Sequence, residues 1–193
     1  MICEMGFENF TFKKLANEIN TTEASVYRYF ENKHRLLIYI ITWFWTWLEY
    51  QLVFHTNNIN DKSAKIQIIV KLLTFSLEDK FLLEHIDKDK LQQIAIAEGN
   101  KAYLTKHVGE DNSAKLFKPY KDLCHRIAAI FIEYNPKYQY PNSLASTLIE
   151  TAHHQIYFKK HLPSLTDFSK EKSIAPISGF LEHFIISTLS SKC

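Results

Sequence analysis

The spacing in this sequence that comes nearest to a metal site is Glu150 with His153. An E-x-x-H pair is the helical spacing that ferritin-like di-iron proteins use twice within a four-helix core. The other such pair, Glu31 with His34, lies where a long helix is expected to begin. One half-site does not make a site, so a ferritin-like metalloenzyme is the weakest interpretation of this chain.

Nucleophilic and phosphate-transfer chemistry has no better support. The sequence contains no glycine-rich phosphate loop, G-x-S-x-G or HExxH, and the neighbours Cys124 and His125 cannot face each other on a helix. Cys3, Cys124 and Cys193 are odd in number, far apart and without a CxxC pair, which is typical of a reducing cytosol. We therefore expect a cytoplasmic protein that is not an enzyme and uses no cofactor or metal.

Arginines are the side chains that could recognise guanine or phosphate with two hydrogen bonds. Only Arg28, Arg35 and Arg126 are arginine among the 23 basic residues, and the net charge is only +2. Overall charge thus favours neither nucleic acid nor membrane as a partner. The positions of the three arginines therefore decide whether the chain can read DNA.

Arg28 falls on the second of two short predicted helices. The apolar spacing predicts a helix from Phe12 to Ile19, capped by Thr11. Asn20 tolerates the left-handed conformation that ends a helix, and Thr22 is placed to cap the next one, from Glu23 to about Phe30. Two short helices joined by a three-residue turn are the helix-turn-helix pattern.

The rest of the chain is expected to be helical as well. Asn32 caps a long helix from Lys33 to about Phe54 that contains the apolar run Leu36–Leu48, which at 13 residues is too short to span a membrane. The segment Val108–Asn112 is expected to be a loop. Further helices are predicted at Asp61–Asp79, Asp87–Thr105, Ser113–Tyr134 with a kink at Pro119, Asn142–Leu162 and Ile174–Ser191.

Length and composition agree with this organisation. The chain has 193 residues, of which 46% are hydrophobic and 23% charged, the balance of a globular protein. Four glycines and five prolines are too few for the turns of sandwiches, barrels or nucleotide-binding α/β folds. We predict an all-α fold of eight or nine helices, with an N-terminal helix-turn-helix head joined by the long helix to a helical body.

Residues Gly6 to Leu37, GFENFTFKKLANEINTTEASVYRYFENKHRLL, resemble the DNA-binding domain of the TetR family of bacterial transcriptional regulators. The features that carry this resemblance are Gly6-Phe7, Thr11, Leu15-Ala16, Tyr27, Tyr29-Phe30, Lys33 and Leu36-Leu37. Asn20 replaces the family's usual glycine, and only Met1 to Met5 stand where the family has a full first helix. The resemblance implies a DNA-binding domain at residues 1–37, N-terminally truncated relative to the family, and a ligand-binding and dimerisation domain at 38–193.

The resemblance also implies which residues meet double-stranded DNA. Thr11, Tyr27, Tyr29 and Lys33 match family positions that contact phosphates. Ala24, Ser25 and Arg28 are expected to face the major groove, and Thr22 is counted with the interface. The charges from Met1 to Leu37 sum to zero, so non-specific affinity is expected to be weak.

The aromatic residues of the body are candidates for an effector site. Their first interpretation is core, because a helix that is apolar all round is a buried helix. They can also line an apolar cavity between helices, and the family's body holds an inducer pocket. The expected lining residues for a small apolar or aromatic effector are Trp43, Trp47, Tyr103, Phe117 and Tyr120.

The function implied is a ligand-responsive TetR-like regulator, a repressor that binds a palindromic operator as a homodimer. The last two long helices carry apolar residues on more than one face and are expected to form a four-helix interface with a second copy. The alternative is a helical ligand-binding dimer with a vestigial head.

Overall fold

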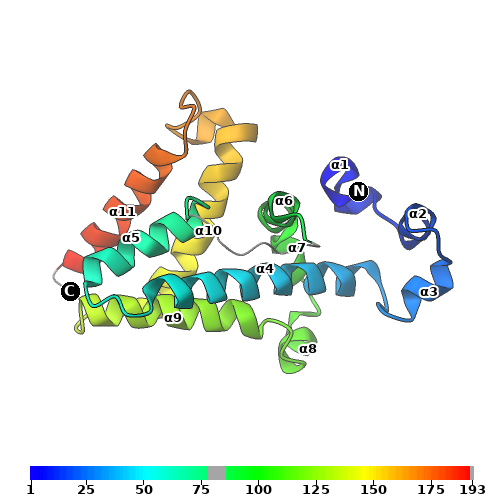
Figure 1. Ribbon diagram of the computed structural model, residues 1–193, viewed down its shortest axis with the longest axis horizontal. Coiled ribbons are helices and arrows are strands. Elements are labelled where there is room, and N and C mark those ends of the chain that lie inside the picture. The colour runs from blue at the N-terminus through cyan, green and yellow to red at the C-terminus, as the bar shows by residue number, and fades with distance from the viewer. Residues whose placement is uncertain (78–85, 192–193) are drawn as a thin grey trace. The chain divides into compact units, whose positions relative to one another are not determined.

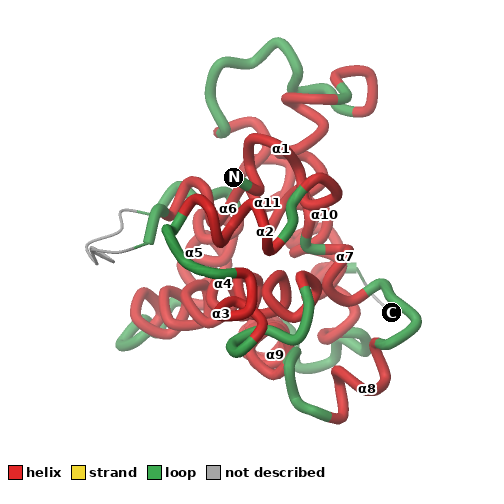
Figure 2. The backbone as a smooth tube through the Cα atoms, turned by 90° about the vertical axis from the view of Figure 1, so that its right-hand side faces the viewer, coloured by secondary structure: helices red, strands yellow, loops and turns green. Residues whose placement is uncertain are grey.

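The computed structural model describes residues 1–77 and 86–191, and every regular element in those ranges is a helix (Figure 2). The predicted all-α fold is confirmed. Two expected features, the end of a helix at Asp79 and the third cysteine at Cys193, lie outside the described residues.

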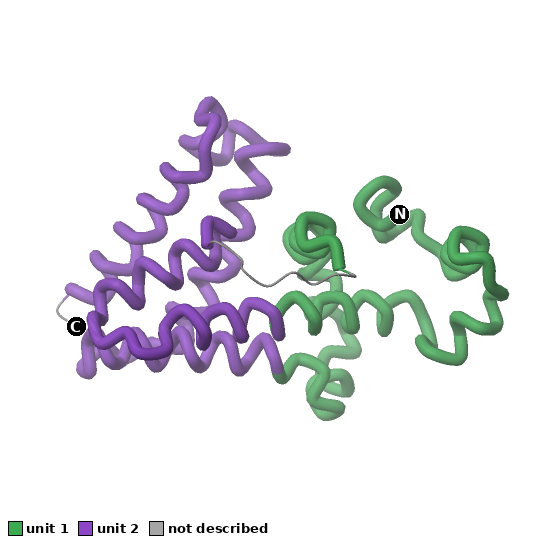
Figure 3. Tube along the Cα trace, viewed as in Figure 1, with its two compact units in different colours: residues 1–45, 83–118 green, residues 46–82, 119–193 purple. Residues whose placement is uncertain are grey.

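The chain divides into two compact units, residues 1–45 with 83–118 and residues 46–82 with 119–193 (Figure 3). The helix α4 (Lys33–Thr56) passes through the boundary and contributes to both units. The other helices of the first unit are α1 (Ile2–Asn9), α2 (Phe12–Glu18), α3 (Glu23–Tyr27), α6 (Lys88–Glu98), α7 (Asn100–Tyr103) and α8 (Val108–Ser113). Those of the second unit are α5 (Lys62–Leu73), α9 (Lys118–Tyr134, whose first residue ends the first unit), α10 (Pro141–His161), the short 3₁₀ helix η1 (Pro163–Leu165) and α11 (Ala175–Ser190), all labelled in Figure 1 except η1.

Each unit has its own apolar core. In the head, Phe10 and Phe12 are buried with their rings edge to face at 6.4 Å, and Ala16 and Val26 complete the packing of α2 against α3. In the second unit α5, α10 and α11 pack together. Its fully buried side chains include Ile66, Ile69, Leu148, Ile177 and Leu181.

The helix α4 is long and apolar enough to cross a membrane by length and composition alone, a test that the core helix of a soluble protein also passes. Leu37, Phe44 and Leu48 on this helix are completely buried. Packing within the protein accounts for this buried side. Tyr39, Trp43 and Tyr50 of the same helix are exposed, so α4 is buried on one side rather than all round as the sequence predicts.

The N-terminal residues form more helix than the sequence suggested. Rather than Met1–Met5 alone, α1 runs from Ile2 to Asn9 and bends at Gly6, which has φ +74° and ψ 157°. Glycine adopts this conformation without strain, because it has no Cβ. The bend lets Ile2 and Phe7 both enter the core of the first unit.

The segment around Val108–Asn112, predicted as a loop, is helix α8. Glu110 and Asp111 stand in its first turn, where negative charge stabilises a helix N-terminus. The helix expected from Ser113 to Tyr134 begins only at Lys118, because Lys115 takes the left-handed conformation with φ +58°. Pro119 does not kink this helix. It lies in the first turn, where a backbone N–H would have no acceptor within the helix, so the N–H that proline lacks is not needed.

Three other helices are shorter than predicted. The helix expected over Asp87–Thr105 is divided at Gly99 into α6 and α7. α5 ends at Leu73 because Phe75 has φ +54°. α3 ends at Tyr27, where the chain tightens into a turn closed by the N–H of Tyr29 on the carbonyl of Val26 at 3.0 Å.

Candidate nucleic-acid interface

Two side-chain caps fix the helix-turn-helix. The hydroxyl of Thr11 accepts the N–H of Lys14 at 3.3 Å, and that of Thr22 accepts the N–H of Ser25 at 3.2 Å. Between the helices Asn20 has φ +52°, and the N–H of Thr21 closes the turn on the carbonyl of Ala16 at 2.8 Å. The predicted caps and the left-handed turn residue are thus confirmed.

The exposed side of α3 and the turn after it carry four of the expected DNA contacts. Val26 is buried and holds the helix to the core, while Ala24, Tyr27, Arg28 and Tyr29 are exposed. We call these four residues the recognition surface. Tyr29 is 82% exposed, a large aromatic side chain that folding leaves in solvent and therefore available for contact with a partner.

Several of the expected DNA contacts also serve the fold. The ring of Tyr27, a member of the recognition surface, packs edge to face on Phe12, with centroids 4.9 Å apart. The hydroxyls of Thr22 and Ser25 lie 2.9 Å from each other and form one hydrogen bond. The hydroxyls of Thr22 and Ser25 therefore help to position the recognition surface.

Lys33 is bound to the end of α1. Its Nζ donates to the carbonyls of Phe7 and Glu8, both at 3.1 Å, and lies 4.8 Å from the centre of the Phe7 ring. Two of its three ammonium hydrogens are therefore used within the protein. The positive charge still lies beside the helix-turn-helix, where one hydrogen remains for a phosphate.

A carboxylate from α6 holds the same end of α1. Glu98 is buried, and its Oε1 accepts the N–H of Phe7 at 3.1 Å, which satisfies a backbone donor exposed by the bend at Gly6. Lys101 lies 2.8 Å from both Glu98 and Glu8. Its hydrogen bonds, to Glu8 first and then to Glu98, raise the pKa of Lys101.

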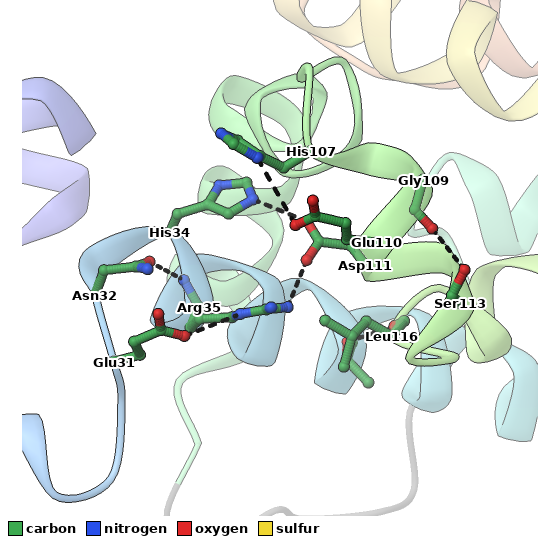
Figure 4. A network of polar contacts seen from close by, with 11 residues as sticks. Glu31, Asn32, His34, Arg35, His107, Gly109, Glu110, Asp111, Ser113 and Leu116 are labelled. Carbon is green, nitrogen blue, oxygen red and sulfur yellow. Dashed lines mark hydrogen bonds and ion pairs between the residues drawn. The ribbon is translucent and has the colours of Figure 1, made fainter.

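Arg35, the other arginine near the head, is also paired. Arg35 donates from Nη1 to Oδ1 of Asp111 at 2.5 Å, and His34 Nε2 lies 3.3 Å from Oδ2 of the same carboxylate (Figure 4). Asp111 is only 1% exposed. Within the recognition surface, Arg28 is the arginine that is available to contact a base.

The five aromatic residues expected to line an effector site divide between the units. Trp43, Tyr103 and Phe117 belong to the first unit, and Trp47 and Tyr120 to the second. All but Trp43 are half-buried. Tyr103 donates to Asn100 Oδ1 at 2.9 Å, and Tyr120 donates to Glu150 Oε1 at 2.8 Å, so both hydroxyls are oriented by the protein.

A groove of about 510 Å³ lies elsewhere in the second unit and is lined by none of those five residues. Leu52 and Ile130 form apolar parts of its wall, and Arg126 lines it while donating from Nε to Glu49 at 2.6 Å. Sequence reasoning missed this groove because its walls come from the end of α4, the following loop, α5 and α9.

No local pattern in the sequence predicts the polar cluster of His34, Arg35 and Asp111. Asp111 lies 76 positions from Arg35, too far for any helical spacing to pair them. Glu98 and Phe7 are likewise 91 positions apart. Such contacts depend on how α6 and α8 pack within the first unit.

The E-x-x-H pair serves other purposes. Glu150 accepts the hydrogen bond from Tyr120, and His153 is buried with its ring stacked 6.3 Å from that of Phe75. Burial lowers the pKa of His153 to about 4, with a smaller contribution from His154. Within residues 1–77 and 86–191 no group of three or more His, Cys, Asp or Glu side chains is arranged to hold a metal ion.

Comparison with known proteins gives two kinds of match. The chain shares its fold with AibR, whose crystal structure is a complex with isovaleryl coenzyme A and operator DNA (TM-score 0.63, 16% identity, 95% of this chain and 90% of that one). It also shares its fold with the fatty acid degradation regulator FadR from Bacillus halodurans (TM-score 0.64, 15% identity, 100% and 94%). No curated protein matches the sequence significantly.

The second kind of match concerns the head. The family model described as bacterial regulatory proteins, tetR family, matches residues 1–40, which span α1 to α3 and the first turns of α4. This range contains both caps, the turn and the recognition surface. The head of the chain, residues 1–40, therefore matches the N-terminal domain of the bacterial regulatory proteins of the tetR family.

Proposed function

We propose that the chain is a cytoplasmic, ligand-responsive transcriptional repressor that binds a palindromic operator in double-stranded DNA as a homodimer. The observation that carries the proposal is the recognition surface: Arg28 and Tyr29 are exposed on a capped helix-turn-helix within the matched residues. An exposed arginine on such a helix can bind the O6 and N7 atoms of guanine in the major groove. We assign DNA binding to residues 1–37.

We assign ligand binding and dimerisation to residues 38–193. The proposed effector carries a small apolar or aromatic group. The residues proposed to contact that group are Trp43, Tyr103 and Phe117 of the first unit or Trp47 and Tyr120 of the second. AibR, which shares this fold, is in complex with isovaleryl coenzyme A, and this supports an acyl coenzyme A thioester as the first compound to test. FadR, which also shares the fold, regulates fatty acid degradation, and this supports the same chemical class.

For the dimer we propose α10 and α11 as the interface. The subunit itself already buries Leu148, Ile177 and Leu181, so these do not remain for a partner. Phe180 is 37% exposed, and its ring lies 5.9 Å from that of Phe168 and 6.4 Å from that of Phe184. A second copy that covered this aromatic row would bury it in an isologous contact.

The alternative is a ligand-binding dimer with a vestigial head. The near-neutral charge of residues 1–37 favours it, because non-specific DNA affinity comes mainly from phosphate neutralisation. The intact caps and the exposed Arg28 favour a working head.

Selection of a duplex from a random-sequence pool, followed by fluorescence titration at several salt concentrations, separates the two. A working head enriches a palindromic sequence and binds it with a shallow salt dependence. Lys13, Lys14 and Arg28 are exposed in each head, and Lys33 keeps one hydrogen for a phosphate, so the log–log slope for a dimer should be no steeper than about −7. Failure to enrich any duplex at low salt would favour the vestigial head.

A further inference from the structure

The start of α4 is attached to α8 through one buried carboxylate. Asp111 Oδ1 accepts from Arg35 Nη1 at 2.5 Å, and Oδ2 lies 3.3 Å from His34 Nε2 (Figure 4). Asp111 is the one residue of α8 that is buried. This helix is therefore held to α4 by a charge-assisted contact, which is directional, rather than by an apolar side chain.

The same turn of α4 receives the chain from the recognition helix. Asn32 caps α4 by accepting the N–H of Arg35 at 2.9 Å, and Glu31 Oε2 lies 3.9 Å from Arg35 Nε. Residues 28–32 are all that separate α3 from α4. The side chain and the backbone of Arg35 thus connect Asp111 to the segment that carries Arg28 and Tyr29.

Lys33, in the same turn, donates to two carbonyls of α1. The first turn of α4 is therefore joined to α1, to α8 and to the segment that follows α3. The pair is buried on one side only, since the side chain of Asp111 is 2% exposed and that of Arg35 is 33% exposed. Loss of the Asp111 charge leaves the Arg35 guanidinium without this partner. A change at Asp111 should accordingly alter the position of the recognition surface.

We propose that Asp111 is a positioning residue for operator recognition: through Arg35 and His34 it fixes the first turn of α4 and so the orientation of the recognition helix. This inference rests on the proposed function. Asp111 itself lies on α8 and outside the helix-turn-helix, so its effect on DNA is indirect. Operator affinity then depends on where α8 holds this carboxylate.

The test compares Asp111→Asn with Glu110→Gln, which removes the neighbouring exposed carboxylate of the same helix. Each variant of the full chain is titrated with the duplex that the unmodified protein selects and with a duplex of unrelated sequence. We expect Asp111→Asn to weaken binding of the selected duplex by about tenfold and to leave the unrelated duplex unchanged, since no phosphate-facing cation is altered. Glu110→Gln should change neither.

A loss of folding is distinguished by the thermal midpoint and by a second variant. Arg35→Gln combined with Asp111→Asn removes both charges together and leaves no charged partner uncompensated in that ion pair. Arg35→Gln alone is measured beside it. Because both side chains act through one contact, the double variant should bind the selected duplex no more weakly than Asp111→Asn or Arg35→Gln alone.

Unchanged affinity of a folded Asp111→Asn protein for the selected duplex overturns the inference. So do additive losses in the double variant, or an equal loss in Glu110→Gln. If the unmodified protein selects no duplex at all, the proposed function fails and the inference fails with it.

Discussion

Arg28 is the residue at which sequence-specific recognition should be measurable. It is exposed on the recognition surface, opposite the buried Val26, so its truncation should not disturb the fold. Arg28→Ala should cost about 1–3 kcal/mol of operator binding and relax preference at one operator position. Competition between duplexes that differ at single positions measures both effects.

Lys13→Ala is the matched control, because Lys13 is an exposed cation of α2 in the same head. It should weaken all duplexes alike and reduce the salt slope by about one per contact. If Arg28→Ala behaves in the same way, Arg28 is only a phosphate contact and base preference comes from Ala24 or from DNA shape.

At the same scale, His153 should link stability to pH. Burial holds its pKa near 4, whereas the unfolded chain titrates near 6.5. Below pH 6.5 the unfolded state binds a proton that the folded state does not, so stability rises with pH between about 4 and 6.5. This contribution is complete above pH 6.5 and amounts to about 3 kcal/mol at its limit.

Urea unfolding at pH 7, 6, 5 and 4 measures this linkage. In His153→Gln the corresponding part of the pH dependence should be absent. His154→Gln, at the exposed neighbouring position, should retain most of it. Parallel pH profiles for the unmodified protein and His153→Gln would show that His153 does not titrate as described.

At the scale of single elements, α3 is the helix that depends most on its cap. It has only five residues, too few to form a helix without support from outside. Thr22 accepts the N–H of Ser25 and pairs with its hydroxyl. Thr22→Ala should therefore destabilise the helix by about 1 kcal/mol and weaken operator binding.

Amide exchange of residues in α3 and titration with operator measure the two consequences. Thr21→Ala is the control, because Thr21 is the preceding exposed threonine and closes the turn through its backbone N–H. Equal exchange rates in the Thr22→Ala variant and the unmodified protein would mean that packing alone maintains α3.

For the whole molecule, the row of Phe168, Phe180 and Phe184 should decide the oligomeric state. Phe180→Glu places a charge on a side chain that is partly exposed and stacked on Phe184. If this row is the interface, the substitution should shift light scattering from dimer to monomer, because an isologous contact brings the two new charges close together. Loss of the dimer should also remove preference for a palindromic site.

Tyr140→Glu is the control, since Tyr140 is 58% exposed and lies before α10. It should remain dimeric. A monomer for the unmodified protein at micromolar concentration would contradict the whole assembly, and a dimer for Phe180→Glu would place the interface elsewhere.

The local features of this protein follow from its amino-acid sequence alone. Thr11, Asn20, Thr22 and Asn32 could be assigned their cap and turn roles because each acts on backbone groups within a few residues. Apolar periodicity located α2, α4 and the last two long helices to within two residues for the same reason.

Features that depend on distant partners could be assigned only from the packed helices. Asp111 is predicted in a loop, and the contact of its buried carboxylate with Arg35 makes it the anchor of α8. Lys33 is expected on phosphate, and the carbonyls of Phe7 and Glu8 accept two of its three ammonium hydrogens. A pattern confined to neighbouring residues carries no information on such contacts, because the chain brings their partners together only when whole helices pack.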